Sequence, residues 1–224
     1  MKKIFLILAA AVVLSSVAWA DEFFKCRKET YVYDNHKGGT YSDEFYFINN
    51  FMVFPHYYYE SRQFIFYYKE EGRNLYNAFG EFFPEYIGHG ELGGVAYGVG
   101  VPPVAIDTKI EEIKYRKTDF YKLLAGEFYR WYLQKEAFKH SDNADFDCLA
   151  AFVEIAKIFS KEDLRILRNT IYAKYGYKFK SADLNEIFSK CDWYSPKESS
   201  AENIEERFNC LESSLLEVIK LAEK

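Results

Sequence analysis

One helix has both of its ends encoded in the sequence, between Ser160 and Gly176. Ser160 is a favourable N-cap residue, because its hydroxyl can accept a hydrogen bond from an unpaired amide of the first turn. Glu162 and Asp163 follow, and they place negative charge at the positive end of the helix dipole. Gly176 can adopt the left-handed conformation that ends many helices. The segment therefore predicts a helix of defined length.

Two faces of this predicted helix differ in character. The apolar face is formed by residues at helical spacing, namely Leu164, Leu167, Ile171 and Tyr175. This stripe predicts contact with a hydrophobic core, and Tyr175 is expected to pack there. The neighbouring face carries Arg165, Arg168 and Tyr172, and any ligand contact of this helix is expected on that face.

Residues in and after this segment resemble the YARHG domain, a presumed extracellular bacterial module named after its own signature. The resemblance is carried by Leu164-Arg165, Arg168-Asn169, Ile171, Tyr172-Ala173, Gly176 and Phe179. It continues over a second capped helix at residues 181–189, the Asp192-Trp193-Tyr194 turn and a final long helix, and so covers residues 160–224. The resemblance implies an extracellular location and a helical domain, but no biochemical activity.

The signature itself differs here, because the family's Arg-His is Lys174-Tyr175 in this chain. No role that needs the histidine, such as that of an imidazole general base, can be carried over to this position. The candidate binding residues of the region are Arg165, Arg168, Asn169, Tyr172, Lys174, Trp193 and Tyr194. A structural alternative stays open for Arg168 and Asn169, which could form a polar network that ties the Trp193 turn to the helix.

The first 20 residues have the features of a secretory signal peptide. Lys2 and Lys3 precede an apolar run at residues 4–14, and Ala18-Trp19-Ala20 fits an A-x-A cleavage site. We expect the mature chain to begin at Asp21 and to be exported to the periplasm or the medium. An uncleaved signal that anchors the chain is the alternative, which the short apolar run disfavours. No later apolar run is long enough to span a bilayer.

Composition constrains the partners of the mature chain. Loss of Lys2 and Lys3 leaves 27 of the 29 basic residues against 34 acidic ones, hence a net charge of −7 with histidine neutral. Nucleic acid is therefore not an expected partner. The histidines lack acidic neighbours at ligand spacing, so neither a metal nor another cofactor is expected; they are His36, His56, His89 and His140.

Four cysteines allow three disulfide pairings in an oxidising compartment. Cys191 ends the second predicted helix of the C-terminal region, and Cys210 lies midway along the final one, so we expect these two to pair. Cys148 shares a helix face with Phe152, which leaves Cys26, near the first strand, as its partner. Metal binding is the rival interpretation, but no C-x-x-C spacing supports it.

The predicted fold class is α+β. Residues 21–117 are expected to form an aromatic-rich antiparallel β meander or small barrel, with strands at residues 30–33, 44–48, 63–68 and 111–116. Residues 118–159 are expected to form a helical connector on the sheet, with Asp119 as an N-cap and apolar faces at Phe120, Leu124, Phe128 and Trp131 and at Cys148, Phe152, Ile155 and Phe159. Residues 160–224 are expected to form a three-helix domain whose last helix carries Ile204, Phe208, Leu211, Leu215 and Val218 on one face.

Three further patterns have two interpretations each. Residues 88–93 fit G-x-G-x-x-G, but the glycines and prolines that follow predict a surface loop, or a mobile lid, and not the helix that a nucleotide site needs. Glu81, Glu85 and Glu91 could supply the carboxylate pair of a glycosidase or form a solvated face. Aromatic runs such as residues 57–59 could stack on sugars or fill the core.

The preferred functional hypothesis is an exported, non-enzymatic binding or envelope-associated protein with a cell-wall polymer as its ligand. The sequence identifies no catalytic residue. One alternative is a glycan-directed hydrolase with a carboxylate pair in the N-terminal domain, which two buried carboxylates facing one cleft would favour. Another is a structural or inhibitory partner of a second exported protein, which a contiguous apolar surface patch would favour.

Overall fold

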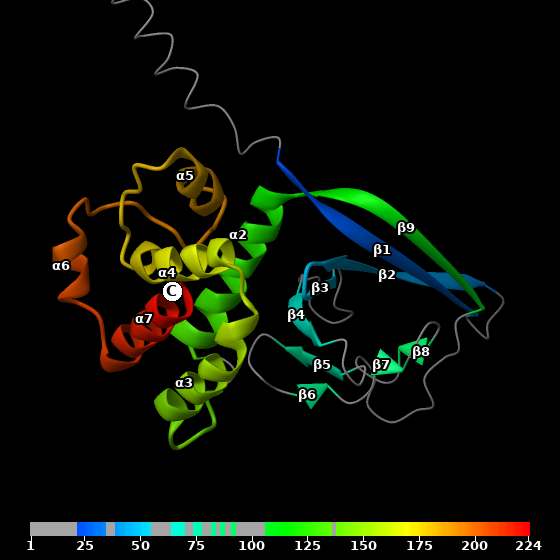
Figure 1. Ribbon diagram of the computed structural model, residues 1–224, viewed down its shortest axis with the longest axis horizontal. Coiled ribbons are helices and arrows are strands. Elements are labelled where there is room, and N and C mark those ends of the chain that lie inside the picture. Colours follow the sequence, from blue (N-terminus) through cyan, green and yellow to red (C-terminus); the bar gives the residue numbers. More distant parts are fainter. Residues whose placement is uncertain are drawn as a thin grey trace, which may run out of the picture.

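The computed structural model has a curved sheet beside a group of helices, an α+β arrangement (Figure 1). It describes residues 22–34, 39–54, 64–69, 74–77, 82–83, 86–87, 91–92, 106–135 and 138–224. Outside these residues lie the signal segment, the tyrosine run at 57–59, most of the glycine-rich segment, and Glu81, Glu85, His36, His56 and His89. Among the described helices, none is both long and apolar enough to cross a membrane.

Seven of the described strands form one sheet in the order β6-β5-β4-β3-β2-β1-β9, with every neighbouring pair antiparallel. Their bounds are β1 (Phe23–Asp34), β2 (Thr40–Ile48), β3 (Phe51–Phe54), β4 (Phe64–Lys69), β5 (Asn74–Asn77), β6 (Phe82–Phe83) and β9 (Asp107–Arg116). A separate pair consists of β7 (Tyr86–Ile87) and β8 (Glu91–Leu92). The sequence-based expectation of an antiparallel meander is confirmed from β1 to β6, and β9 returns to pair with β1.

Six described α-helices follow the sheet, namely α2 (Lys117–Phe128), α3 (Ala144–Ile155), α4 (Lys161–Lys174), α5 (Ala182–Phe188), α6 (Ala201–Glu205) and α7 (Cys210–Ala222). A π-helical turn at Tyr129–Leu133 extends α2, and a 3-10 turn at Ala156–Ile158 extends α3. The helices predicted for residues 160–224 correspond to α4, α5 and α7. The short helix α6 was not predicted.

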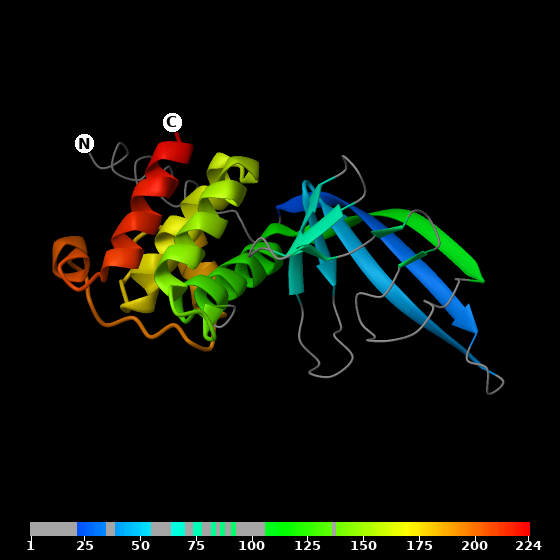
Figure 2. The same cartoon turned by 90° about the horizontal axis from the view of Figure 1, so that it is seen from below.

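Helix α2 joins the sheet to the other helices, because it continues directly from β9 (Figures 1 and 2). Its Phe120 ring is fully buried, with centroids 5.3 Å from Phe24 of β1 and 5.7 Å from Phe51 of β3. Helix α2 also packs on α4 and α5, while α3 packs on α7. The connector predicted to rest on the sheet therefore contacts the C-terminal helices as well, and one hydrophobic core extends from Ile48 of β2 to Ile219 of α7.

Both predicted ends of α4 are confirmed. The Ser160 hydroxyl accepts from the Asp163 amide at 3.1 Å, and the Asp163 carboxylate accepts from the Ser160 amide at 2.8 Å, which forms a capping box. Gly176 has φ +78°, the left-handed conformation expected at the end of the helix. Of the predicted apolar stripe, Leu164, Leu167 and Ile171 are buried, but Tyr175 is only half-buried.

Two predicted helix boundaries are corrected by the structure. Helix α2 begins at Lys117, so Asp119 lies in its first turn and accepts from Arg116 Nε at 3.1 Å instead of capping the helix. The single final helix is divided into α6 and α7. The reason is a capping box, in which Asn209 and Glu212 exchange backbone-to-side-chain hydrogen bonds of 2.9 Å and so start a new helix.

All four cysteines are free in the structure, so neither predicted pair, Cys26–Cys148 or Cys191–Cys210, is present. The division of the final helix explains part of this result, because Cys210 is the first residue of α7 and faces solvent. Cys191 is buried, with its Sγ 3.6 Å from the Ile187 carbonyl oxygen. The Cys148 thiol likewise points at a backbone carbonyl, that of Tyr132, at 3.8 Å.

Thiol labelling of the mature chain should distinguish these cysteines. Burial raises the pKa of the Cys26 thiol to about 11 and the pKa values of Cys148 and Cys191 to about 12, so few thiolates form at pH 8. We expect iodoacetamide to modify Cys210 in the folded protein and the other three only in denaturant, as read by peptide mass spectrometry. A peptide that joins Cys191 to Cys210 in exported material would instead support the sequence-based pairing.

Substitution of two glycines should have different effects on stability. A Cβ at residue 176 would lie 2.4 Å from the Ser195 carbonyl oxygen, in a backbone conformation that L-residues avoid. We expect Gly176→Ala to lower the free energy of unfolding by more than about 2 kcal/mol. Gly126→Ala is the matched control, because it lies inside α2 with no heavy atom within 4 Å of the added Cβ; it should be neutral or stabilise by up to about 1 kcal/mol. Urea denaturation measures both, and equal effects would contradict the assigned conformation.

Candidate functional site

Most of the sequence-predicted binding residues are engaged inside the helical part of the molecule. Arg165 donates to Asp183 Oδ2 at 2.6 Å and to Ser181 Oγ at 3.2 Å, which ties α4 to the start of α5. Burial raises the pKa of Asp183, but the hydrogen bonds from Arg165 and Ser181 oppose it and hold that pKa below its usual value. The Arg165 side chain therefore has a structural partner and is not directed at an open site.

The proposed polar network of Arg168 and Asn169 has a different location from the one expected. Arg168 Nη1 lies 2.5 Å from Glu223 Oε2, just beyond α7, and does not contact the Trp193 turn. Asn169 Nδ2 donates to the Arg165 carbonyl oxygen of its own helix at 2.7 Å. The Tyr172 hydroxyl donates to Glu205 of α6. This face of α4 thus holds other helices in place.

The aromatic turn after α5 packs against the π-helical turn after α2. The Trp193 ring stacks on the Tyr129 ring with centroids 4.2 Å apart and planes 6° apart. The Tyr194 hydroxyl donates to the Tyr177 carbonyl oxygen at 2.7 Å. One face of the Trp193 ring is therefore covered by the protein.

A fully buried carboxylate lies under the end of α4. Glu212 of α7 accepts from Lys174 Nζ, from the Tyr175 hydroxyl at 2.7 Å and from the Asn209 amide at 2.9 Å. Burial raises the pKa of Tyr175 to about 12, with a further contribution from the Glu212 hydrogen bond. The expectation that Tyr175 serves as a core ring is corrected, because its hydroxyl binds a buried charge and its ring is half-exposed.

An open pocket of about 310 Å³ is lined by two of the donors to this carboxylate, Lys174 and Tyr175. It is lined by Lys174, Tyr175, Gly176, Trp193, Ser195, Lys197, Glu198 and Arg207. The wall at residues 195–198 is fixed to the end of α4, because the amides of Lys197 and Glu198 donate to the Gly176 carbonyl oxygen at 2.7 and 3.0 Å. We call this hollow the α4 pocket.

The structure brings only two of the predicted binding residues, Lys174 and Trp193, into the α4 pocket. Sequence reasoning missed Lys197 and Arg207, which lie in loops where no periodicity marks a face. A local signal for the pocket was nevertheless present in Gly176, whose missing side chain admits the backbone of Ser195.

Positive charge is concentrated at the mouth of the α4 pocket. Lys197 and Arg207 are exposed, and neither forms an ion pair with a described carboxylate. The Arg207 guanidinium carbon lies 4.8 Å from the centroid of the Tyr175 ring, a cation–π contact. Glu198 accepts from the amides of Ser200 and Ser199 at 2.9 and 2.7 Å, and these hydrogen bonds lower its pKa. The carboxylate is thus engaged with its own loop.

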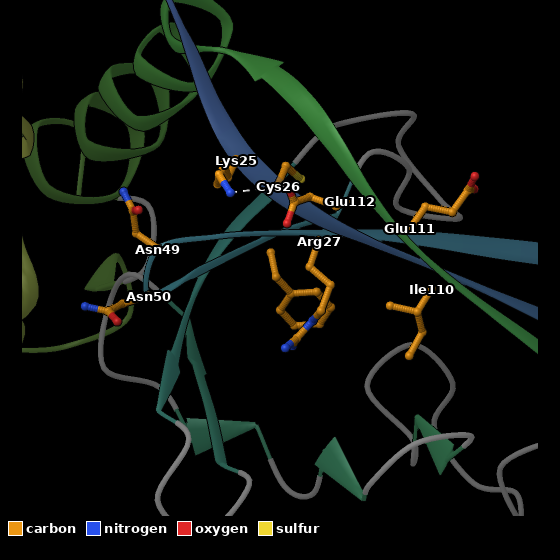
Figure 3. A pocket seen from close by; sticks show the side chains of 9 residues that line it. Lys25, Cys26, Arg27, Asn49, Asn50, Ile110, Glu111 and Glu112 are labelled. Carbon is orange, nitrogen blue, oxygen red and sulfur yellow. Dashed lines mark ion pairs between the residues drawn. The ribbon is translucent and has the colours of Figure 1, made fainter.

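A larger hollow of about 520 Å³ lies on the sheet (Figure 3) and is lined by Lys25, Cys26, Arg27, Phe47, Asn49, Asn50, Ile110, Glu111 and Glu112. Its cationic side chains form ion pairs with neighbouring carboxylates. Lys25 Nζ lies 3.4 Å from Glu112 Oε1, and Arg27 Nε lies 2.8 Å from the buried Glu29 Oε1. The Arg27 guanidinium is also stacked over the Phe47 ring at 4.5 Å. This hollow therefore has less unpaired charge for a ligand than the α4 pocket.

The sheet hollow does not contain the carboxylate arrangement of a glycosidase in its described part. Glu111 and Glu112 are neighbours in β9, so their side chains leave opposite faces of the strand. In Figure 3, Glu112 lies beside Lys25 while Glu111 points away from this pair. Within the described residues, no group of three His, Cys, Asp or Glu side chains is arranged to hold a metal ion, and His140 is exposed.

Comparison with known families agrees with the C-terminal architecture. The family model for the YARHG domain matches residues 150–224. This range begins inside α3 and includes all of α4 to α7. The match confirms the resemblance of residues 160–224 and extends it back to residue 150, inside α3. No curated protein and no solved structure matches the chain. The residues that correspond to the family signature are Tyr172 to Gly176, and three of them line the α4 pocket.

Two substitutions of Tyr175 separate a polar role from a core role. Tyr175→Phe removes a donor to the buried Glu212, so we expect the free energy of unfolding to fall by about 1–2 kcal/mol. Tyr175→Ala should cost only about 1 kcal/mol more, because the ring is half-exposed. Tyr177→Phe is the matched control, since the Tyr177 hydroxyl donates to no described group, and should stay within about 0.5 kcal/mol. A large loss with alanine but none with phenylalanine, in urea denaturation, would restore the core role.

Proposed function

We propose that the chain is an exported bacterial protein that binds a cell-wall polymer without acting on it chemically, and that the α4 pocket makes the contact. The observation that carries this proposal is the position of Lys174, Tyr175 and Gly176, which occupy family signature positions and also line a pocket. The predicted signal peptide supports export, and the YARHG match supports a location outside the cytoplasm.

The residue types of the α4 pocket support binding more than catalysis. Lys197 and Arg207 can hold negative or polar groups, and the Tyr175 ring offers an apolar surface beside them. A glycosidase acid needs a raised pKa, whereas the pKa of Glu198 is lowered by the amides that it binds. Tyr175, with a pKa of about 12, stays protonated near neutral pH and cannot act there as a base.

Cell-wall polymers suit this combination of groups, because they carry sugar rings, peptides and anionic substituents along one chain. A single pocket of about 310 Å³ accommodates only a small part of such a polymer. We therefore expect weak binding per site, with retention on an insoluble wall that offers many copies of the ligand.

A second candidate is supported by an exposed apolar face. Phe146 and Val153 lie two turns apart on one side of α3, with 72% and 40% of their surface exposed. Such a face is suited to contact with another protein. It lies on different elements from the α4 pocket, so single substitutions can separate the two candidates.

Retention on purified sacculi tests both candidates with the intact mature chain. We expect the wild type to sediment with sacculi at low salt, and Lys197→Glu to reduce the bound fraction at least fivefold, because it reverses a charge at the pocket mouth. Lys161→Glu, at the opposite end of α4, is the matched control and should bind like the wild type.

Two results would contradict the proposal. One is the absence of retention at low salt. The other is retention that Phe146→Asp abolishes and Lys197→Glu leaves unchanged, which would move the contact to the apolar face of α3. Circular dichroism and urea midpoints of each variant show that the comparison is made between folded proteins.

A further inference from the structure

We propose that the ligand group held in the α4 pocket is an anion, a phosphate or a carboxylate, bound between Lys197 and Arg207 beside the Tyr175 ring. The inference rests on the proposed binding site, but it does not require that the anion belongs to a cell-wall polymer. It specifies the chemical group that the pocket binds.

The charge balance of the pocket lining favours an anionic ligand. Lys174 is neutralised by the buried Glu212, with which it forms an ion pair. Two cations, Lys197 and Arg207, then remain against one lining carboxylate, Glu198. The excess is positive although the chain as a whole carries a net charge of −5. A local excess of positive charge on an acidic protein favours an anionic ligand at this place.

The orientation of Glu198 strengthens this argument. Its Oε1 accepts from both the Ser199 and Ser200 amides, and its Oε2 lies 3.5 Å from Asn203 Nδ2. These hydrogen bonds hold the carboxylate on the loop before α6, where it does not serve as the ion-pair partner of Lys197. A ligand anion can take that role.

The surroundings of the two cations are fixed before a ligand arrives. The segment at Lys197 is hydrogen-bonded to Gly176, and the Tyr175 ring under Arg207 is oriented by its bond to Glu212. Trp193 is fixed by its stacking on Tyr129. A preorganised wall lowers the entropy cost of binding. The planar Arg207 guanidinium can offer two donors to one carboxylate or phosphate group.

Other ligand classes fit these groups less well. A cation would be repelled by Lys197 and Arg207, and a neutral sugar would leave both charges without a counterion. Phosphate and carboxylate groups share the required negative charge and acceptor oxygens, and they differ in charge and shape. The test therefore uses one phosphate probe and one carboxylate probe.

Titration of the ¹⁵N-labelled mature chain by NMR measures the binding directly. Inorganic phosphate and acetate are the probes at low ionic strength, with glucose as the neutral control. We expect millimolar phosphate or acetate to shift the amide signals of Gly176, Lys197 and Glu198, and glucose to leave them unchanged. Preference for phosphate identifies a phosphate site, and equal or stronger binding of acetate identifies a carboxylate site; either result supports the inference.

Two alanine variants, one conservative variant and a control define the site. Lys197→Ala and Arg207→Ala should each weaken binding of the preferred probe about tenfold, the effect of one lost charge-assisted hydrogen bond. Both side chains are exposed, so the folded spectra should otherwise be preserved. Lys161→Ala, remote from the pocket, should bind like the wild type. Lys197→Arg should retain most of the affinity, because the charge is kept.

The inference is overturned if neither probe shifts the pocket amides, or if both alanine variants bind like the wild type. Its failure can be told apart from failure of the proposed function. Phosphate binding without retention on sacculi would refute the cell-wall ligand and leave the anion site intact. Retention on sacculi without binding of either probe would refute the anion site alone.

Discussion

The C-terminal architecture depends on the hydrogen bonds that the buried carboxylate of Glu212 accepts. Its donors come from the end of α4, through Lys174 and Tyr175, and from the start of α7, through Asn209. An unpaired charge in this position would cost several kcal/mol, whereas three donors satisfy it. The same contact therefore starts α7, holds α4 against it and fixes Lys174 and Tyr175, which line the α4 pocket.

Aromatic side chains hold the sheet against the helices. Phe51 of β3 contacts Phe120 of α2 and Phe159 before α4, with ring centroids 5.7 and 5.4 Å apart. Phe152 of α3 continues the cluster through Phe159. Large rings fill the space between a curved sheet and crossing helices with few side chains. Core packing thus accounts for these four rings, which are buried and are not available to stack on sugars.

Sequence reasoning succeeded where structure depends on local signals and failed where it depends on distant ones. Ser160 and Gly176 determine the ends of α4 through their own hydrogen bonding and backbone freedom, so both ends could be predicted. Periodicity placed Tyr175 on the apolar stripe, but this residue is the C-cap with ψ 4° and no longer follows the helix. Lys197 and Arg207 line the same pocket because the loop of residues 195–198 pairs with Gly176 and α7 packs on α4. No sequence spacing contains that information.

The presence of Lys174 and Tyr175 at the signature positions limits the chemical roles that these positions can have. Lys174 and Tyr175 stand where the family has arginine and histidine, and here both donate hydrogen bonds to Glu212. Arginine and histidine are also donors, so either pair could satisfy a buried carboxylate at this place. Tyrosine with a pKa of about 12 cannot replace histidine as a general base near neutral pH. The role that both pairs can share is therefore one of support, in which Lys174 and Tyr175 donate to Glu212 and so hold one wall of the α4 pocket in place.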